Sequence, residues 1–427
     1  MFGFFASPER KMRENAGNWL ELADKVYHYR RDVLSAAEVT ELQGETTGLR
    51  GLLKEKAGVE KLKLGIERLE EVLRRTGGAI YPKSSLVENV EFFLVAAIVI
   101  LGIRTYFLQP FKIPTNSMWP TYNGMTPEAF PRQADEPGYV MNAVRFVAFG
   151  AQPKRVDAPA AGEVMIPVGA GGPRVSIPYR EVPGRSWLVF PTTLKEYAIY
   201  VGGKPAMVRV PMDFDFEWAV RDCFFPNSTP SHEPGGVDLA RALAKQPDAP
   251  SLDGGRIRML RTGRMVREGE RVMAFDILTG DQLFVDRMSY HFVPPPVGSG
   301  FVFRTGNIEG IARTYGDQYY IKRLAGAPGE TLEIRDFGLF TNGKPTEGSP
   351  VFAANAKRDG NYVGYRYEGL LSAGRSVKLG KDEYFALGDN SANSADGRYW
   401  GTVPAKDVVG RPVVVYYPFT KHWGLAK

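Results

Sequence analysis

Three short segments of the chain contain residue types that could carry out nucleophilic chemistry. In the first, Phe111-Lys-Ile-Pro-Thr-Asn-Ser-Met-Trp-Pro-Thr121, Pro114 and Pro120 hold Ser117 in a defined, non-helical turn. A serine held in this way becomes a nucleophile when a base lies beside it. Taken alone, a serine between two prolines is more often structural, so this segment needs a partner elsewhere.

The second segment offers a lysine in an apolar run that ends at a Gly-Ala-Pro-Gly turn. A strand there would place Lys322 on the same face as Tyr320 and Leu324. Ile321 and Arg323 would then lie on the opposite face. Desolvation would lower the pKa of the Lys322 amine and let it act as a general base near neutral pH. The alternative is a lysine at a sheet edge whose amine reaches solvent, and this segment alone favours that alternative.

Small hydrogen-bonding residues fill the third segment, Leu387-Gly-Asp-Asn-Ser-Ala-Asn-Ser-Ala-Asp-Gly-Arg-Tyr-Trp-Gly401. Asp396 and Arg398 lie two positions apart in it, which predicts a polar, turn-rich loop closed by an ion pair. The loop alone does not indicate a reaction.

Together the three segments resemble the boxes of type I signal peptidases, the serine endopeptidases that release exported proteins from their signal peptides. They occur in the order of that family. Gly280-Asp-Gln-Leu-Phe-Val-Asp-Arg287 and Gly298-Ser-Gly-Phe-Val-Phe-Arg304 resemble the strands between the boxes. The resemblance covers residues 88–125 and 276–418, and boxes found in order are a more specific signal than any one of them.

The resemblance implies a role for each matching residue. Ser117 would be the nucleophile and Lys322 the base that takes its proton. The Ser117 N–H and the Thr115 hydroxyl would form the oxyanion hole, and Ser394 would hydrogen-bond and orient Lys322. Small substrate pockets, which suit Ala-x-Ala cleavage sites, would be lined by Phe111, Ile113 and Ile321. The loop that carries Ser394 would be supported by Asp389, Asp396 and Arg398.

The sequence departs from the family pattern mainly in length. Residues 126–275 stand where the family passes directly from the nucleophile box to the next strand, and they carry no recognisable motif. We interpret them as an inserted domain of unknown role, with strand-like pieces at 163–166 and 207–210 and a loop at 227–255. Gly298-Ser-Gly300 also replaces the usual Gly-Asp pair at a strand entry.

The elements that must position these residues begin with a helical arm, residues 1–87. Apolar residues recur at helical spacing over residues 12–75, and Gly44, Gly48 and Gly51 predict a break between two helices. A helical hairpin or short coiled coil is the interpretation, and a partner-binding arm is the alternative.

An uncharged run of 12 residues follows at 92–103, shorter than the ~20 residues that a spanning helix needs. Extending it over apolar and aromatic flanks gives a membrane anchor at residues 88–108, with a buried core helix as the alternative. The run lies too far along the chain for a cleavable secretory signal.

Basic residues set the expected orientation of this anchor. Arg74, Arg75 and Lys83 precede it, whereas Lys112 stands alone after it. The positive-inside rule then predicts a single-pass protein of the cytoplasmic (inner) membrane, with its N-terminus in the cytoplasm and its catalytic domain on the extracytoplasmic side.

The remaining residues, 109–125 and 276–427, are predicted to form the catalytic domain. Alternating runs between turn residues predict a mainly β fold with signal-peptidase-like antiparallel sheets, with strands at 282–286, 300–304, 331–335, 339–341 and 413–417. Asn342-Gly343 predicts a two-residue hairpin, and the similar string around Gly202-Gly203 predicts a hairpin of the same type.

Composition excludes several other functions. The net charge of +6 on 427 residues is too mild to indicate a nucleic-acid partner. One cysteine permits no internal disulfide, and no two of the four histidines have ligand spacing, so we expect neither a metal site nor a cofactor. Cys223 has no recognisable catalytic partner and is interpreted as a buried structural residue.

The sequence therefore predicts a membrane-bound serine endopeptidase that removes signal peptides through a Ser/Lys dyad and an acyl-enzyme. Its expected partners are the signal peptides of exported preproteins and the lipid bilayer, with the translocation machinery as an open third. One alternative is a Ser/Lys protease that acts on itself. Another is a catalytically inactive, membrane-anchored binding or assembly protein, although the presence of Ser117, Lys322 and Ser394 together favours an enzyme.

Overall fold

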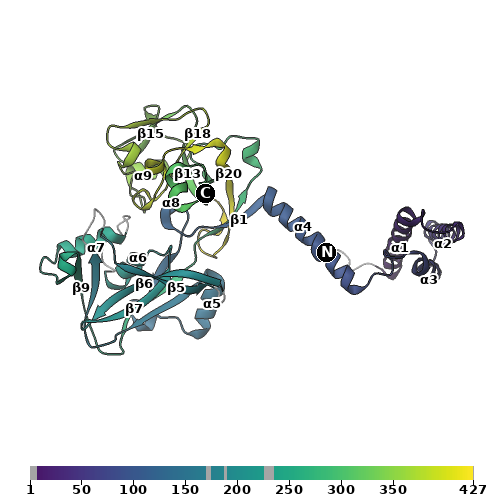
Figure 1. Cartoon of the computed structure of the whole chain (residues 1–427), viewed down its shortest axis with the longest axis horizontal. Helices are drawn as coiled ribbons and strands as arrows, with labels where there is room; N and C mark the ends of the chain where they lie inside the picture. The colour runs from purple at the N-terminus through teal and green to yellow at the C-terminus, as the bar shows by residue number, and fades with distance from the viewer. Residues whose placement is uncertain (1–6, 170–174, 187–189, 226–234, 427) are drawn as a thin grey trace. The chain divides into compact units, whose positions relative to one another are not determined.

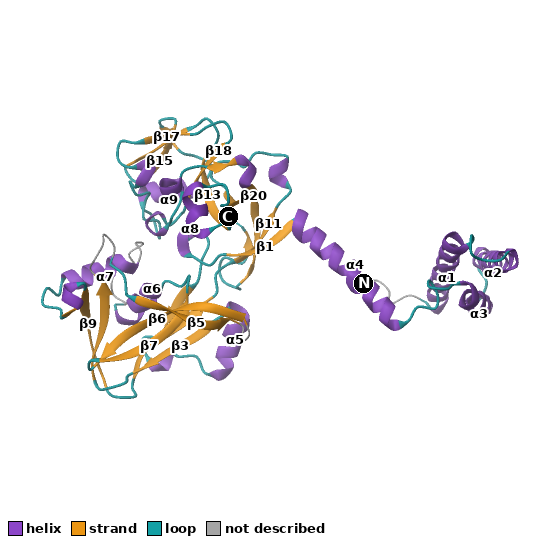
Figure 2. Ribbon diagram, viewed as in Figure 1, coloured by secondary structure: helices purple, strands orange, loops and turns teal. Residues whose placement is uncertain are grey.

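The computed structural model describes residues 7–169, 175–186, 190–225 and 235–426 (Figure 1). The chain divides into two compact units, residues 1–101 and 102–427. Helices make up the described part of the first unit, and strands dominate the second (Figure 2). The predicted mainly β region and the predicted helical N-terminal region are therefore confirmed.

The N-terminal arm packs its helices around a small apolar core. Its helices are α1 (Pro8–Arg30), α2 (Ala36–Lys54) and α3 (Val59–Thr76). The predicted break at Gly44–Gly51 is wrong, because these glycines lie inside α2. A capping box between Ser35 and Glu38 starts that helix, and Leu42 and Leu49 are buried against its neighbours, so packing outweighs the glycines' poor helix propensity.

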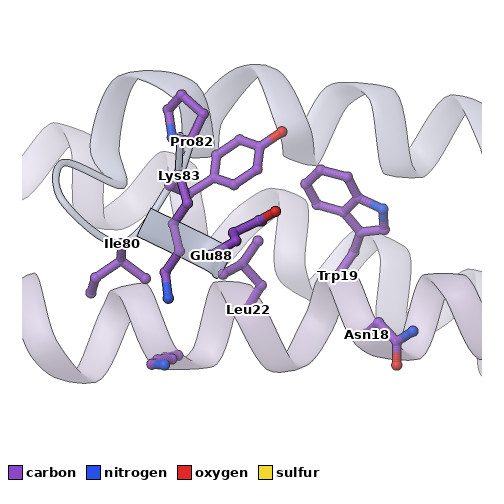
Figure 3. Close-up of a pocket in the computed structure, with 9 residues that line it drawn as sticks. Asn18, Trp19, Leu22, Ile80, Pro82, Lys83 and Glu88 are labelled. Carbon is purple, nitrogen blue, oxygen red and sulfur yellow. The ribbon is translucent and has the colours of Figure 1, made fainter. Parts of the chain in front are cut away.

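The segment after α3 folds back over α1 and forms a shallow hollow beside it (Figure 3). Trp19 and Leu22 of α1 line this hollow together with Ile80 and Tyr81. The rings of Trp19 and Tyr81 meet edge to face at 5.4 Å, which fastens the returning segment to α1.

Helix α4 (Ser85–Tyr106) is long and apolar enough to cross a membrane. It has 22 residues, a mean hydropathy of 2.2 over its most apolar window and no buried residues. The helix begins three residues before the start of the predicted anchor at 88–108. It ends two residues before the end of that anchor, because the chain continues into strand β1 (Leu108–Lys112).

The candidate site residues lie on and around an antiparallel sheet of the second unit. The strand order is β1, β11, β20, β12, β13, β18 and β19, with β21 paired to β20. After β1, the bounds are β11 Gln282–Asp286, β12 Gly300–Arg304, β13 Tyr319–Gly326, β18 Glu383–Leu387, β19 Val403–Pro404, β20 Val408–Tyr417 and β21 Gly424–Leu425. Strand β13 is interior, so the alternative of an edge lysine at Lys322 is excluded.

A smaller sheet continues the same region, with strand order β16, β15, β14 and β17. Its bounds are β14 Thr331–Arg335, β15 Gly338–Thr341, β16 Lys344–Pro345 and β17 Ser376–Lys378. Asn342 and Gly343 have positive φ between paired strands, as the predicted hairpin requires. Gly202 and Gly203 do the same between β6 and β7, so both hairpin predictions are confirmed.

Residues 126–278 form two further sheets. One has the order β2 (Thr126–Ala129), β10 (Arg271–Leu278), β3 (Gln152–Asp157). The other contains β4 (Gly162–Gly169), β5 (Tyr179–Ser186), β6 (Phe190–Val201), β7 (Lys204–Pro211), β8 (Ser251–Leu252) and β9 (Ile257–Val266). These sheets share one apolar core, in which valine and isoleucine side chains of β4, β6 and β7 meet Phe275 of β10.

Three helices pack with these sheets, and the sequence patterns did not predict them. They are α5 (Tyr139–Phe149), α6 (Phe216–Phe224) and α7 (Gly235–Ala244). The loop predicted at 227–255 is wrong for residues 235–244, where Leu239 and Leu243 of α7 are buried in the core. Residues 227–234 of that prediction lie outside the described residues. The remaining helices are α8 (Glu309–Tyr315), α9 (Pro350–Lys357) and α10 (Gly397–Trp400).

Candidate active site

Ser117 lies on a tight turn that glycines on neighbouring segments allow to pack closely. The turn is a short 3-10 helix, η1 (Asn116–Met118), just beyond β1. A Cβ atom on Gly124 would stand 2.3 Å from the Thr115 carbonyl carbon, and one on Gly280 would stand 1.8 Å from the Ile113 oxygen. Side chains at these two positions would displace the turn, so the two glycines allow the backbone that carries Ser117 to pack closely against its neighbours.

Asn116 fastens this turn from inside. Its side chain is 1% exposed. The Asn116 Oδ1 atom accepts a hydrogen bond from the Gly124 N–H at 3.0 Å, and its Nδ2 donates to the Met125 oxygen at 3.0 Å and to Asp215 Oδ2 at 2.9 Å. The residue before the candidate nucleophile is therefore held by three partners.

Lys322 extends from β13 to the same place. Its Nζ donates a hydrogen bond to Ser117 Oγ, although the two residues are 205 positions apart in the chain. Lys322 is 4% exposed, and no carboxylate among the described residues forms an ion pair with its amine. The structure thus brings together the serine and lysine that the sequence singled out.

Burial changes the acid–base chemistry of this lysine. Desolvation lowers the pKa of Lys322 from 10.5 to about 8, because a charged amine loses its hydration there. Asp396 and Asp389 act in the opposite direction through their charges, and Arg398 adds to the lowering. A sizeable fraction of the amine is therefore neutral close to physiological pH and can accept a proton.

The polar loop after β18 closes over the nucleophile turn. The Asn390 backbone N–H donates to the backbone carbonyl oxygen of Ser117 at 3.1 Å, and its side-chain amide donates to the backbone carbonyl oxygen of Asn116 at 3.1 Å. The pairing of Arg323 with Leu387 in the sheet brings the start of the loop level with Lys322. A Cβ atom on Gly388 would lie 2.1 Å from Ser394 Oγ and 2.6 Å from the backbone carbonyl oxygen of Ser117, so only glycine fits between them.

Two fully buried ion pairs hold the loop to the sheet. The Arg398 guanidinium binds Asp396 through Nε–Oδ1 at 2.8 Å and Nη2–Oδ2 at 2.9 Å, and Asp396 Oδ2 also accepts from the Gly388 N–H at 3.0 Å. Asp389 binds Arg323 through two contacts of 2.7 and 2.6 Å. The Asp389 pair was missed from sequence, because Arg323 was expected only to face away from Lys322.

Ser394 lies beside the dyad without joining it. Its Oγ is buried and has no hydrogen-bond partner among the described residues. Thr115, the implied oxyanion-hole residue, is exposed and directly precedes η1 in an extended conformation, with φ −110° and ψ 159°.

The implied pocket residues gather in one apolar cluster. Ile113 is buried at its centre, and Phe111 and Ile321 pack against it while staying partly exposed. The Phe111 ring also meets Tyr319 edge to face at 5.1 Å. An apolar surface thus lies next to the turn and on the strand that carries Lys322.

Cys223 and His422 have other roles. Cys223 is buried in α6, and burial raises the pKa of its thiol to about 12, so the structural interpretation holds. His422 is buried, and its Nδ1 lies 2.8 Å from Asp281 Oδ2, which also accepts from the Asn123 N–H. The backbone carbonyl oxygen of Asp281 accepts a hydrogen bond from the Ile113 N–H, so the His422–Asp281 pair supports the segment that leads to Ser117. Nothing in the local sequence indicated it.

Comparisons with known proteins point to one family. A family model described as signal peptidase, peptidase S26, matches residues 257–417. The chain is 30% identical over 141 residues to a signal peptidase I of Leptolyngbya laminosa, covering 33% of this chain and 62% of the relative. It is 37% identical over 109 residues to signal peptidase I S of Bacillus subtilis, covering 25% and 55%. The chain spans less than two thirds of the length of these relatives.

Residues 257–417 are similar to signal peptidases. A crystal structure of a signal peptidase I from Enterococcus faecalis aligns with 28% of this chain and 97% of that chain, at 27% identity and a TM-score of 0.21. The matched signal peptidase region contains Lys322, the loop after β18 and Ser394. Ser117 precedes it, so the link between the two halves of the dyad rests on the contacts described above.

The close fit at Gly388 gives a first test. Gly388→Ala should destabilise the loop by about 1–3 kcal/mol, because its new methyl group overlaps Ser394 and the backbone of Ser117. Hydrogen exchange of the Gly388 and Asn390 amides should become faster. Gly138→Ala is the matched control, since a Cβ there meets nothing within 4 Å. Unchanged exchange in Gly388→Ala would contradict the packing.

Proposed function

We propose that this chain is a membrane-anchored serine endopeptidase that removes N-terminal signal peptides from exported preproteins, with Ser117 as nucleophile and Lys322 as general base. The observation that carries the proposal is the hydrogen bond between the buried Lys322 amine and Ser117 Oγ. Similarity of residues 257–417 to signal peptidases supports the substrate class.

The chemistry needs the lysine in its neutral form. The amine would take the Ser117 proton as Oγ attacks the scissile carbonyl, and it would then pass that proton to the leaving amine. The Ser117 N–H and the Thr115 hydroxyl would stabilise the negative charge on the carbonyl oxygen. Water would hydrolyse the resulting acyl-enzyme, with Lys322 acting as base again. In this proposal Ser394 orients the amine, which requires its unpartnered hydroxyl to turn toward Lys322 when substrate is bound.

Substrate choice would follow from the apolar cluster beside the dyad. Phe111, Ile113 and Ile321 form an uncharged apolar cluster, in which Ile113 is buried and Phe111 and Ile321 are partly exposed. In this proposal the cluster forms pockets that accept only small side chains. This is consistent with cleavage after Ala-x-Ala, because a pocket made of packed apolar side chains rejects larger groups by steric clash.

The proposal also gives the chain a place in the membrane. The predicted anchor, residues 88–108, which includes most of the apolar helix α4, would cross the cytoplasmic membrane, with the arm (1–87) in the cytoplasm and the remaining residues outside. Residues 109–125 and 276–427 would form the catalytic domain and residues 126–275 an inserted domain. The anchor would then hold the dyad where signal peptides emerge.

Alanine variants test the dyad directly. Ser117→Ala should abolish cleavage of a purified preprotein, and Lys322→Ala should lower kcat by about 100- to 10,000-fold, the usual contribution of a general base. Ser376→Ala and Lys378→Ala, on the exposed strand β17, are matched controls that should cleave normally. Retained cleavage in either dyad variant would contradict the mechanism. Failure of an acylating serine inhibitor to label wild-type Ser117 would favour an inactive binding or assembly protein.

The pH dependence of cleavage should report the lysine. A protonated amine cannot accept a proton, so kcat/KM should rise by about tenfold per pH unit below the pKa of Lys322 and level off above about pH 8. The measurement is kcat/KM for one preprotein between acidic and mildly alkaline pH. A profile that is flat through this range would show that Lys322 does not limit the reaction by its protonation.

A further inference from the structure

We propose that Asp215, which belongs to the segment 126–275, is a positioning residue for the catalytic pair, so that this segment forms part of the working active site. The inference deepens the proposed function and rests on it. It assigns a task to a part of the chain in which the sequence shows no motif.

One carboxylate oxygen connects two catalytic segments. Asp215 Oδ2 accepts a hydrogen bond from Asn116 Nδ2 at 2.9 Å and lies 3.4 Å from Asn393 Nδ2. Asn116 directly precedes Ser117, and Asn393 directly precedes Ser394. Asp215 therefore bridges the residue before the nucleophile and the residue before the third member of the site.

The geometry of Asn116 makes this acceptor necessary. Because the Gly124 N–H donates to Asn116 Oδ1, the amide nitrogen must face the opposite way. One of its hydrogens goes to the Met125 oxygen and the other to Asp215. Removing the Asp215 carboxylate would leave a buried N–H without a partner, and such a group is expensive enough to rotate the side chain and disturb the turn.

The core of the segment 126–275 holds Asp215 in place. Its neighbours Phe214 and Phe216 are 1% and 0% exposed, and their rings lie 5.9 and 6.2 Å from Phe275 of β10. Trp218, one turn into α6, also meets Trp119 edge to face at 5.5 Å. Asp215 is thus presented by a rigid scaffold, as a positioning group must be.

Burial and nearby polar and charged groups act on the ionisation of Asp215, and its pKa is raised overall. Burial raises the pKa of Asp215, whereas the hydrogen bond from Asn116, the charge of Lys195 and the bond from Asn393 lower it. Asp213 and Glu217 are further acidic groups of the same region. Burial lowers the pKa of Lys112, and the charge of Asp213 opposes that lowering. Asp213 is exposed and makes no hydrogen bond to Asn116, which makes it a suitable control.

Steady-state kinetics of the full-length chain on a purified preprotein test the proposal. Asp215→Ala should lower kcat about 10- to 100-fold with KM within about twofold, because the turn is misplaced while the apolar substrate surface is untouched. Asp215→Asn keeps an oxygen acceptor for Asn116 and should restore most of kcat. Asp213→Ala should match wild type. Wild-type kcat in Asp215→Ala, or no rescue by Asp215→Asn, would overturn the inference.

A double-mutant cycle separates positioning from general damage. If Asp215 acts through Asn116, the variant carrying Asp215→Ala and Asn116→Ala should lose no more kcat than Asn116→Ala alone. Losses that multiply would contradict the proposal. If Asp215→Ala does not fold, Asp215→Leu keeps the volume, removes the acceptor and takes its place in the cycle.

Failure of the proposed function has a different signature. Wild-type protein that does not cleave, or that cleaves equally well as Ser117→Ala, would refute the peptidase itself. Ser117-dependent cleavage that is indifferent to Asp215 would refute only the role of Asp215.

Discussion

The burial of a lysine amine that forms no ion pair within the described part of the chain is the constraint on which this site depends. Taking the Lys322 amine out of water disfavours its charged form, and this is the largest cause of a pKa lowered to about 8. The arrangement is costly for stability, so the surrounding structure must be strong enough to maintain it. The interior position of β13 and the buried Arg323–Asp389 pair beside it provide that strength.

Holding the serine against that amine is a second problem, because the two residues come from distant parts of the chain. The solution is a backbone-dense turn that is fixed from several sides. Gly124 and Gly280 admit close neighbours, the loop after β18 donates hydrogen bonds to the turn, and Asn116 is held from within. Because each of these contacts comes from a different segment, the turn has little freedom to withdraw from Lys322.

The segment 126–275 changes how such a site is held together. A long insertion next to a nucleophile would be expected to loosen its surroundings. Here the segment instead places the Asp215 carboxylate against Asn116 of the turn and the Trp218 ring against Trp119. The segment 126–275 and the turn that carries Ser117 therefore share contacts, which is why we propose for Asp215 a role beyond the stability of its own sheets.

The sequence predicted those parts of the molecule that depend on local pattern. The strand at 282–286 alternates clearly, and the positive-φ turn at Asn342-Gly343 has a strong signature, so both could be predicted directly from the sequence. The strand at 300–304 was also predicted, although four of its five residues are buried. Contacts such as Asp215 with Asn116 join residues 99 positions apart and depend on how two cores meet, so no local pattern announces them. Glycines within α2 and the burial of α7 show the same limit, since packing outweighed local propensity.

The most direct test of this account is the ionisation of Lys322 itself. Heteronuclear NMR of the chain with labelled lysine, titrated with pH and assigned by comparison with Lys322→Ala, would follow the amine without reference to any substrate. The account predicts that one lysine titrates near a pKa of about 8 and that its signal is missing in the variant. Titration of Lys322 near the ordinary value of 10.5 would contradict it, because the amine would then be charged at the pH where the dyad has to work.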